Sequence, residues 1–253
     1  MKLSEGQEIM ISFSSDEFSE LHRGLSLMRD ICNDADLVDG IIRQRSNDKS
    51  CIFEIDMTNL LDKGNMTVIQ LKQKLDLFKI FTGQDVEINI TETDYTFSDQ
   101  YSSISFLLPN MNYIDNKYMG EEELENIFSL NEEDLILETT ISSEISERIK
   151  TIAASFNTTT LEIEFSGDTA EVICTTQAAD QKAKVVRDIV TNRNIEDTST
   201  NLVIIPFISD HDGDMTLSMY NIKDDIIVNK FSSSVGGINY TIYSRSMMIK
   251  EED

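Results

Sequence analysis

The residues best suited to bind a metal ion are three aspartates that alternate within the stretch SDHDGDM. Asp210, Asp212 and Asp214 match positions 1, 3 and 5 of a calcium-binding EF-hand loop. That loop also needs glycine at position 6 for its turn and glutamate at position 12 as bidentate ligand. This chain has Met215 and Asn221 there. The stretch therefore fits a solvated acidic turn better than a metal site, and no cofactor is expected.

The remaining sequence contains no recognised catalytic arrangement. His22 and His211 are the only histidines, and the motifs HExxH, GxSxG and GxxxxGK[ST] are absent. The three cysteines, Cys32, Cys51 and Cys174, have unrelated spacings, which predicts buried reduced thiols rather than disulfides. We therefore expect a protein that is not an enzyme. A metal-dependent enzyme that uses the acidic turn is one alternative.

The composition is that of an acidic globular chain. Its 253 residues are 40% hydrophobic and carry a formal net charge of -25, which suits one large domain or two smaller ones. Such a surface repels nucleic acid at long range, so a nucleic-acid role must use a local basic patch or something other than affinity. No apolar run is long enough for a membrane helix and no signal core opens the chain, so a soluble intracellular protein is expected.

The elements that would position functional residues follow from hydrophobic periodicity. Apolar residues at helical spacing predict helices at about residues 15–28, 66–81 and 142–156. Strands are expected near residues 7–13, 37–45, 51–57, 85–90, 101–109, 160–165, 169–175, 182–190, 202–208, 215–220, 224–231 and 238–249.

The pattern of the first half restarts in the second half. SSEISERIKTIAASF echoes SSDEFSELHRGLSLM, and strands follow each of these helices. The predicted fold class is α+β, with an N-terminal domain at residues 1–109, an acidic interdomain linker at 110–138 and a C-terminal domain at 139–253.

The predicted helices carry much of the positive charge of this acidic chain. The residues concerned are Arg23, Arg29, Lys72, Lys79, Arg148 and Lys150. One interpretation is that they are ordinary solvated positions with pairs such as Glu144 with Arg148. The other is that the helices converge and line one surface with modest positive charge.

In the order and spacing of these segments the chain resembles DNA polymerase sliding clamps, closest to T4-type phage clamps and more distantly to proliferating cell nuclear antigen. The resemblance covers nearly the whole chain. It lies in FEIDMTNLLDKGNMTVIQLKQKLDLFKIF, DVEINITETDYTFSDQYSSISFLLP, TTISSEISERIKTIAASFNTTTLEIEFSGDTAEVICT and LVIIPFI. Three features depart from the family pattern: a nearly missing fourth helix, an unusually acidic linker and a sparse basic lining. Phage clamps also shorten the fourth helix.

The resemblance implies a DNA-clamp fold with two similar domains per chain and a homotrimeric ring around duplex DNA. Helices would line the hole and antiparallel sheets the outside, and the six basic residues would face the DNA. Such a processivity factor holds DNA by topology and without sequence readout, and strong phosphate contacts would make binding steeply salt-dependent. A DNA polymerase and a clamp loader would be its partners, in the cytoplasm of a phage-infected host cell.

The resemblance also implies two protein-binding surfaces. Clamps bind partner peptides beside the linker and the C-terminal strand, where this chain has Tyr113, Ile114, Tyr118, Met119, Tyr243, Met247, Met248 and Ile249. The subunits would join by strand pairing that involves Tyr101, Ser103, Ser105, Leu107, Lys184, Val186 and Arg187. The remaining alternative is a protein-interaction module of the same β/α class that does not bind DNA.

Overall fold

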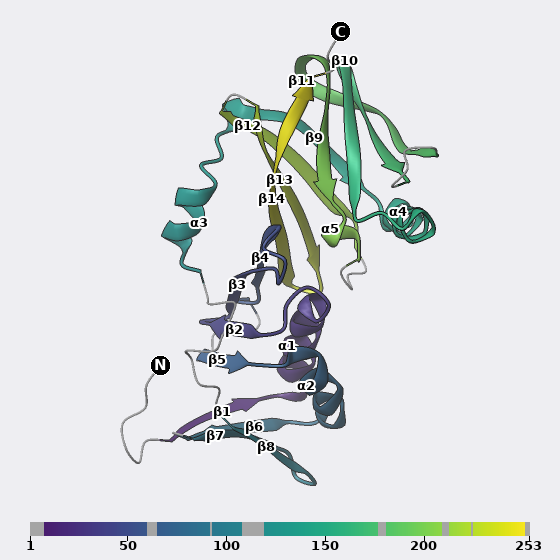
Figure 1. Cartoon of the computed structure of the whole chain (residues 1–253). Helices are drawn as coiled ribbons and strands as arrows, with labels where there is room; N and C mark the ends of the chain where they lie inside the picture. Colours follow the sequence, from purple (N-terminus) through teal and green to yellow (C-terminus); the bar gives the residue numbers. More distant parts are fainter. Residues whose placement is uncertain are drawn as a thin grey trace. The chain divides into compact units, whose positions relative to one another are not determined.

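The computed structural model describes residues 8–59, 65–91, 93–107, 119–176, 181–208, 213–223 and 225–250 (Figure 1). The chain folds into two compact units. The N-terminal unit contains Met1–Asn47, Glu54–Tyr118 and Gly236–Asn239. The C-terminal unit contains Asp48–Phe53, Met119–Val235 and Tyr240–Asp253. The division between residues 118 and 119 falls inside the range 110–138 that the sequence suggests as a linker.

The N-terminal unit combines two helices with antiparallel strands. The helices are α1 (Ser15–Met28) and α2 (Leu71–Phe78), and the latter continues into the 3-10 turn η1 (Lys79–Phe81). One sheet has the order β1-β6-β7-β8, formed by β1 (Ile9–Phe13), β6 (Val86–Ile90), β7 (Asp94–Ser98) and β8 (Ser103–Leu107). The other strands have the order β4-β3-β2-β5, formed by β4 (Cys51–Asp56), β3 (Ile41–Arg45), β2 (Ala35–Val38) and β5 (Asn65–Val68). Of β4, the residues from Glu54 onward belong to this unit, and the residues up to Phe53 belong to the C-terminal unit.

The core of this unit contains a cluster of aromatic rings. Phe18 lies edge-on to Phe78, Phe81 and Phe97 at centroid distances of 6.2, 6.1 and 6.2 Å, a geometry that aromatic quadrupoles favour. The predicted apolar face of the first helix is confirmed, since Leu21, Leu25 and Met28 are buried together with Phe18. Burial of this face attaches α1 to the sheet.

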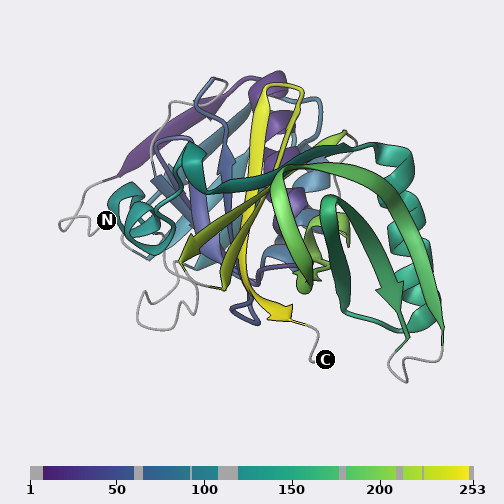
Figure 2. The ribbon, with the colours of Figure 1, turned by 90° about the horizontal axis from the view of Figure 1, so that it is seen from above.

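The C-terminal unit is larger and richer in strands. Its strands are β9 (Leu135–Ile141), β10 (Thr160–Thr175), β11 (Lys182–Val203), β12 (Met215–Lys223), β13 (Ile226–Val235) and β14 (Ile238–Lys250), in the order β10-β11-β9-β12-β13-β14. Its helices are α3 (Glu121–Ile127), α4 (Ser143–Phe156) and α5 (Ile205–Ile208), with a 3-10 turn η3 (Glu132–Asp134). Figure 2 shows α4 running beside β10 and β11.

The two units repeat the same helix-capping arrangement. Ser14 and Ser142 accept hydrogen bonds at the N-termini of α1 and α4, as N-cap serines do. An aspartate that directly precedes a strand adds a second acceptor in each unit. Asp85 accepts from the amide of Ser15, and Asp214 accepts from the amide of Ser143, both at 2.9 Å. The last aspartate of the SDHDGDM turn thus stabilises a helix end.

Several expected elements differ in the structure. The strand expected at 37–45 is two strands, because Asp39 and Gly40 have positive φ and form a turn. The helix expected at 66–81 starts at Leu71, since residues 65–68 pair with β2 as β5. The apolar run at 202–208 ends its strand at Val203 and continues as α5, because a short apolar run fits either structure.

Other expectations hold with different boundaries. The strands expected at 160–165 and 169–175 are parts of one strand, β10, with irregular pairing on either side of Gly167. The range 110–138 contains α3 and the start of β9, so part of it is regular structure. All three cysteines are buried free thiols, as predicted.

Candidate functional site

Three of the expected DNA-facing residues surround one small hollow in the N-terminal unit. Arg29 is the C-cap of α1, and Lys72 and Lys79 lie at the two ends of α2. Together with His22 they line a cavity of about 90 Å³ between the two helices. The ring of His22 connects the two helices, because its Nε2 lies 3.2 Å from the carbonyl oxygen of Leu75 on α2. The packing of α1 against α2 therefore brings the basic groups of α1 beside those of α2, although Arg29 and Lys72 are 43 residues apart in the chain (72 − 29).

Each basic group at this hollow has a carboxylate beside it. Lys72 and Arg29 both contact Asp30, at 2.8 and 3.2 Å, and Lys79 contacts Asp76 at 2.7 Å. The hydrogen bond from Lys72 lowers the pKa of Asp30, and the hydrogen bond from Lys79 lowers the pKa of Asp76. These carboxylates stay ionised at neutral pH and offset part of the positive charge. Exposed pairs of this kind are weak, so a phosphate can compete for the cations.

Arg23 has a different environment within the same unit. Its guanidinium pairs with Glu20 at 2.6 Å. It also lies against the turn at Gly236, where a Cβ atom would come within 1.7 Å of Nη2. Arg23 is absent from the lining of the hollow formed by His22, Arg29, Lys72 and Lys79.

In the C-terminal unit the two basic residues of α4 are also paired. Arg148 contacts Glu144 at 2.5 Å and Lys150 contacts Glu147 at 2.7 Å. The expected pair of Glu144 with Arg148 is confirmed. Arg148 and Lys184 both line a hollow of about 440 Å³ between α4 and the start of β11. The fold therefore brings an expected DNA-facing residue close to an expected subunit-interface residue.

The strands expected at the subunit interface have open edges in the described parts of the chain. β8 is the outer strand of its four-stranded sheet, and Tyr101 and Leu107 are each 79% exposed. Ser103 and Ser105 lie exposed on the same strand.

The corresponding stretch in the C-terminal unit is the first part of β11. Residues 182–190 pair with β10 on one side, and the pairing of β11 with β9 is at Thr191. Lys184 is ion-paired with Glu171, Val186 is half-buried and Arg187 is exposed. Val190 is 71% exposed. Unpaired strand edges with apolar groups are templates for pairing with another chain.

The expected partner-peptide residues are only partly accessible. Tyr113, Ile114 and Tyr118 lie outside the described residues. Met119 is 4% exposed within an apolar cluster, and Tyr243 is half-buried against Phe128. Of the last strand, Met247 and Ile249 are 65% and 50% exposed and Met248 is half-buried.

Sequence reasoning missed the two residues that anchor this cluster. Leu124 and Phe128 are buried, and both belong to the short acidic segment around α3. Their i, i+4 spacing was a weak signal for one helix face. The dense carboxylates around them obscured it.

No metal-binding group of three or more His, Cys, Asp or Glu side chains forms among the residues that the structure covers. Asp210 and Asp212 lie outside those residues, and Asp214 caps α4. Within the same described ranges, no helix is long and apolar enough to cross a membrane.

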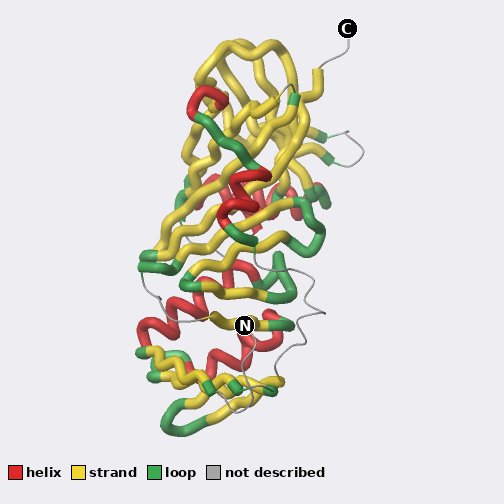
Figure 3. Tube along the Cα trace, turned by 90° about the vertical axis from the view of Figure 1, so that its left-hand side faces the viewer, coloured by secondary structure: helices red, strands yellow, loops and turns green. Residues whose placement is uncertain are grey.

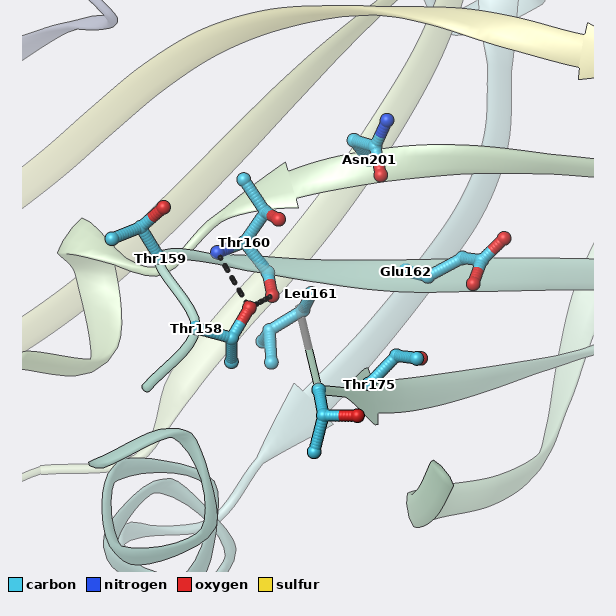
Figure 4. A pocket seen from close by; sticks show the side chains of 8 residues that line it. Thr158, Thr159, Thr160, Leu161, Glu162, Thr175 and Asn201 are labelled. Atoms are coloured by element: carbon cyan, nitrogen blue, oxygen red, sulfur yellow. Dashed lines mark hydrogen bonds between the residues drawn. The ribbon is translucent and has the colours of Figure 1, made fainter. Parts of the chain in front are cut away.

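A separate polar pocket lies in the C-terminal unit (Figure 4). Its volume is about 220 Å³, and threonines from the start and end of β10 line it together with Glu162 and Asn201. The Thr158 hydroxyl donates to the carbonyl of Thr160 at 2.9 Å. The pocket contains no basic side chain and no aromatic ring, so it contributes to neither expected surface.

The arrangement of helices and antiparallel sheets is similar to that of solved structures. A crystal structure of proliferating cellular nuclear antigen from Entamoeba histolytica matches 94% of this chain and 98% of its own, with a TM-score of 0.59 and 11% identity. The A. fulgidus PCNA, in a structure with the C-terminal region of FEN-1 bound, matches 97% of this chain and 100% of its own, with a TM-score of 0.55 and 11% identity.

The chain has the PCNA-like sliding-clamp fold. No protein-family model matches the sequence, and no curated protein matches it. At 11% identity the structural likeness shows the fold. The predicted fold class, α+β with two similar domains of helices packed on antiparallel sheets, is confirmed.

Proposed function

We propose that this protein is a sliding clamp, a processivity factor that encircles duplex DNA and tethers a polymerase. The observation that carries the proposal is the clamp fold over almost the entire chain. Three copies would close a ring through the open edges of β8 and of residues 182–190 in β11. A clamp loader would then be needed to place the ring on DNA.

The charge distribution supports a topological hold on DNA. The chain carries -25 overall, while Arg29, Lys72 and Lys79 gather around one hollow and each has a carboxylate partner. Paired cations of this kind bind phosphate weakly and release it readily. Loose contacts let a ring slide, whereas many strong phosphate contacts would hold it in place and make it steeply salt-dependent.

The partner surface would lie on the C-terminal unit. The structure of the A. fulgidus PCNA has the C-terminal region of FEN-1 bound, and we propose that peptides of polymerase and other partners bind this chain beside Tyr243 and the exposed Met247 and Ile249. The methionine side chains can adapt to several partners. The surrounding acidic charge would favour peptides with basic flanks.

The short helix α5 suggests the T4-type branch. It occupies the position in the second half that α2 occupies in the first, but it has only four residues. T4-type phage clamps shorten the equivalent helix, so we place the protein in the cytoplasm of a phage-infected host cell. Viral replication would be its setting.

The test bypasses the loader and the polymerase, because subunits separated by dilution close into a ring while the DNA is already present. Cysteines introduced by Ser105→Cys and Arg187→Cys would be joined by a bis-maleimide in the presence of a nicked circular plasmid. The native cysteines are buried and serve as an internal control in the unsubstituted chain. Protein that survives denaturant on the circle, and is released when the plasmid is linearised, supports the proposal.

Native mass gives the complementary measurement. The assembly is expected at three times the chain mass of 28.7 kDa. A strictly monomeric protein at micromolar concentration, together with equal retention on circular and linear DNA, would contradict the clamp function.

A second candidate is an interaction module that does not bind DNA. All six basic residues expected to face DNA lie beside carboxylates, which favours this alternative over a conventional DNA binder. A charge-reversed variant with Arg29→Glu, Lys72→Glu, Lys79→Glu and Arg148→Glu separates the two. Without cross-linking, retention on circular DNA falls in this variant if the protein is a clamp, whereas an absence of retention for both the variant and the unsubstituted chain favours the module.

A further inference from the structure

A short acidic segment covers an apolar area on the sheet of the C-terminal unit. The cover segment, residues 119–130, contains α3, which lies over the strands in Figure 3. The area beneath it, the apolar sheet patch, consists of Ile52, Tyr220, Ile222, Val228 and Tyr243.

The contact is apolar and built around an aromatic pair. Leu124 and Phe128 are 8% and 7% exposed, and Val228 beneath them is fully buried. The ring of Phe128 stacks on that of Tyr243 at 5.2 Å with an interplanar angle of 19°. The cover segment therefore presents an aromatic and an aliphatic anchor, spaced four residues apart, to the patch, in addition to the buried Met119 at its start.

The cover segment has little intrinsic stability as a helix. α3 has seven residues, and its N-cap, Gly120, provides no side-chain hydrogen bond. Isolated helices of this length are marginal in water. On the sheet side, Arg245 donates to the carbonyl of Ile127 and its guanidinium lies over the Phe128 ring at 5.2 Å.

The charges around the apolar sheet patch determine which kind of ligand can compete with the cover segment for it. The solvent face of the cover segment carries Glu121, Glu122, Glu123 and Glu125, all exposed. Beside the patch, burial raises the pKa of Tyr220, and the charges of Glu138 and Glu132 raise it further. Those two carboxylates remain near the patch when the cover segment leaves. A ligand with lysine or arginine beside its apolar anchors is thus favoured over an acidic one.

We propose that the cover segment is a built-in occupant of the apolar sheet patch, and that a partner peptide with an aromatic anchor, an aliphatic anchor and a basic flank displaces it. The inference rests on the proposed function only in taking a partner protein to be the competing ligand. Displacement makes the apparent affinity of a partner lower than its intrinsic affinity, by the fraction of time that the patch is uncovered.

The test uses the full chain and two synthetic peptides as probes. The first has the sequence of residues 119–131, and the second has lysine in place of the glutamates at 121, 122, 123 and 125. The variant Leu124→Ala with Phe128→Ala loses the anchors of the cover segment but keeps the patch intact. We expect it to bind both peptides at least about tenfold more tightly than the unsubstituted chain, and the lysine peptide more tightly than the glutamate peptide at low salt.

Two controls separate displacement from general loosening. Adding Tyr243→Ala to the double variant removes the stacking partner and should abolish the gain. Ile88→Ala destabilises the core of the N-terminal unit, where Ile88 is fully buried, and should leave peptide affinity unchanged.

Hydrogen exchange of the unsubstituted chain gives a readout that needs no ligand. The amides of Leu124 and Phe128, which are bonded within the cover segment, should exchange at least about a hundredfold faster than those of β12 and β13, through local opening. Exchange only by global unfolding would overturn the proposal. Equal or weaker peptide binding by the double variant, or no binding by either protein, would overturn it as well. None of these measurements depends on ring assembly or DNA, so the proposed function stands or falls separately.

Discussion

At the scale of single residues, Lys74 is a buried charged residue that belongs to none of the expected surfaces. It is 6% exposed on α2, donates to the Tyr95 hydroxyl at 2.5 Å and lies 4.8 Å from the ring centroid of Phe106 on the edge strand β8. Burial lowers its pKa from 10.5 to about 8, and the charge of Asp34 opposes this shift. Its amine therefore links the helix layer to β7 and β8 and costs desolvation energy while it is charged.

The resulting pH dependence can be measured with Lys74→Met. Between pH 8 and 10.5 the unfolded chain binds the Lys74 proton more tightly than the folded chain, so this residue makes stability rise with pH. Relative to Lys74→Met, the free energy of unfolding of the unsubstituted chain should increase by about 2 kcal/mol from pH 8 to pH 10, with a slope of at most about 1.4 kcal/mol per pH unit. Urea titrations at several pH values measure it.

Lys72→Met is the matched control, because Lys72 lies on the same helix and its side chain is 71% exposed. Its difference from the unsubstituted chain should not show this rise. Parallel pH curves for the Lys74→Met variant and the unsubstituted chain would show that the burial of Lys74 does not act in this way.

Gly236 provides a second residue-scale prediction. Its φ of +58° lies in the left-handed region, and an added Cβ would meet the guanidinium of Arg23. Gly236→Ala should therefore destabilise the protein by about 1 kcal/mol or more. Gly83→Ala is the control, because Gly83 has a φ of +79° but no atom within 4 Å of its Cβ position. If both variants lose equal stability in thermal melts, the contact with Arg23 does not contribute to the loss.

At the scale of elements, the two first helices of the units are held by the same pair of devices. Each helix has a serine N-cap. Each also donates a backbone hydrogen bond to an aspartate that directly precedes a strand distant in the sequence. A carboxylate at a helix N-terminus satisfies an orphan amide and favours the helix dipole. The repeated arrangement ties α1 to β6 and α4 to β12.

Asp85→Ala and Asp214→Ala should each lower the free energy of unfolding by about 1 kcal/mol. The two losses should be similar, since the hydrogen-bond lengths are equal. Chemical denaturation measures both losses, and the control is Asp168→Ala, since Asp168 is exposed where the pairing of β10 is irregular. A loss for Asp85→Ala without one for Asp214→Ala would show that the repeat is not energetically equivalent.

At the scale of the whole molecule, the open strand edges and the net charge decide how copies associate. Leu107 and Val190 expose large apolar side chains at the two edges proposed to pair. Rings remove such edges by pairing them between subunits, while a net charge of -25 opposes non-specific association.

Leu107→Asp and Val190→Asp should each reduce the native mass from three chains toward one at micromolar concentration. Both changes place a charge at an interface that would bury it. Ile80→Asp adds the same charge at an exposed apolar residue of η1, 51% exposed, and should leave the mass unchanged. Equal masses for all three variants, measured by light scattering, would count against the proposed pairing of β8 with residues 182–190 of a neighbouring subunit.

The sequence by itself determined the elements whose signals are local. Helix formation depends on residues that are close in sequence. The residues within one or two turns therefore predict two features: the serine caps of α1 and α4, and the apolar face of Phe18, Leu21, Leu25 and Met28. The repetition of the two halves follows from the same local signals. This repetition, with the order and spacing of the segments, indicated the clamp fold, although no single segment is a strict signature of that fold.

Only the tertiary structure decided which side chains meet. Four features depend on residues far apart in the chain: the carboxylate beside Lys72, the backbone carbonyl of Glu133 that accepts from Arg193, the strand at residues 65–68 and the stack of Phe128 on Tyr243. Acidic residues are so frequent here that spacing alone cannot select the one beside a given lysine. The apolar side chains of the cover segment were hidden among carboxylates until the sheet beneath them was known, because burial depends on packing between distant segments.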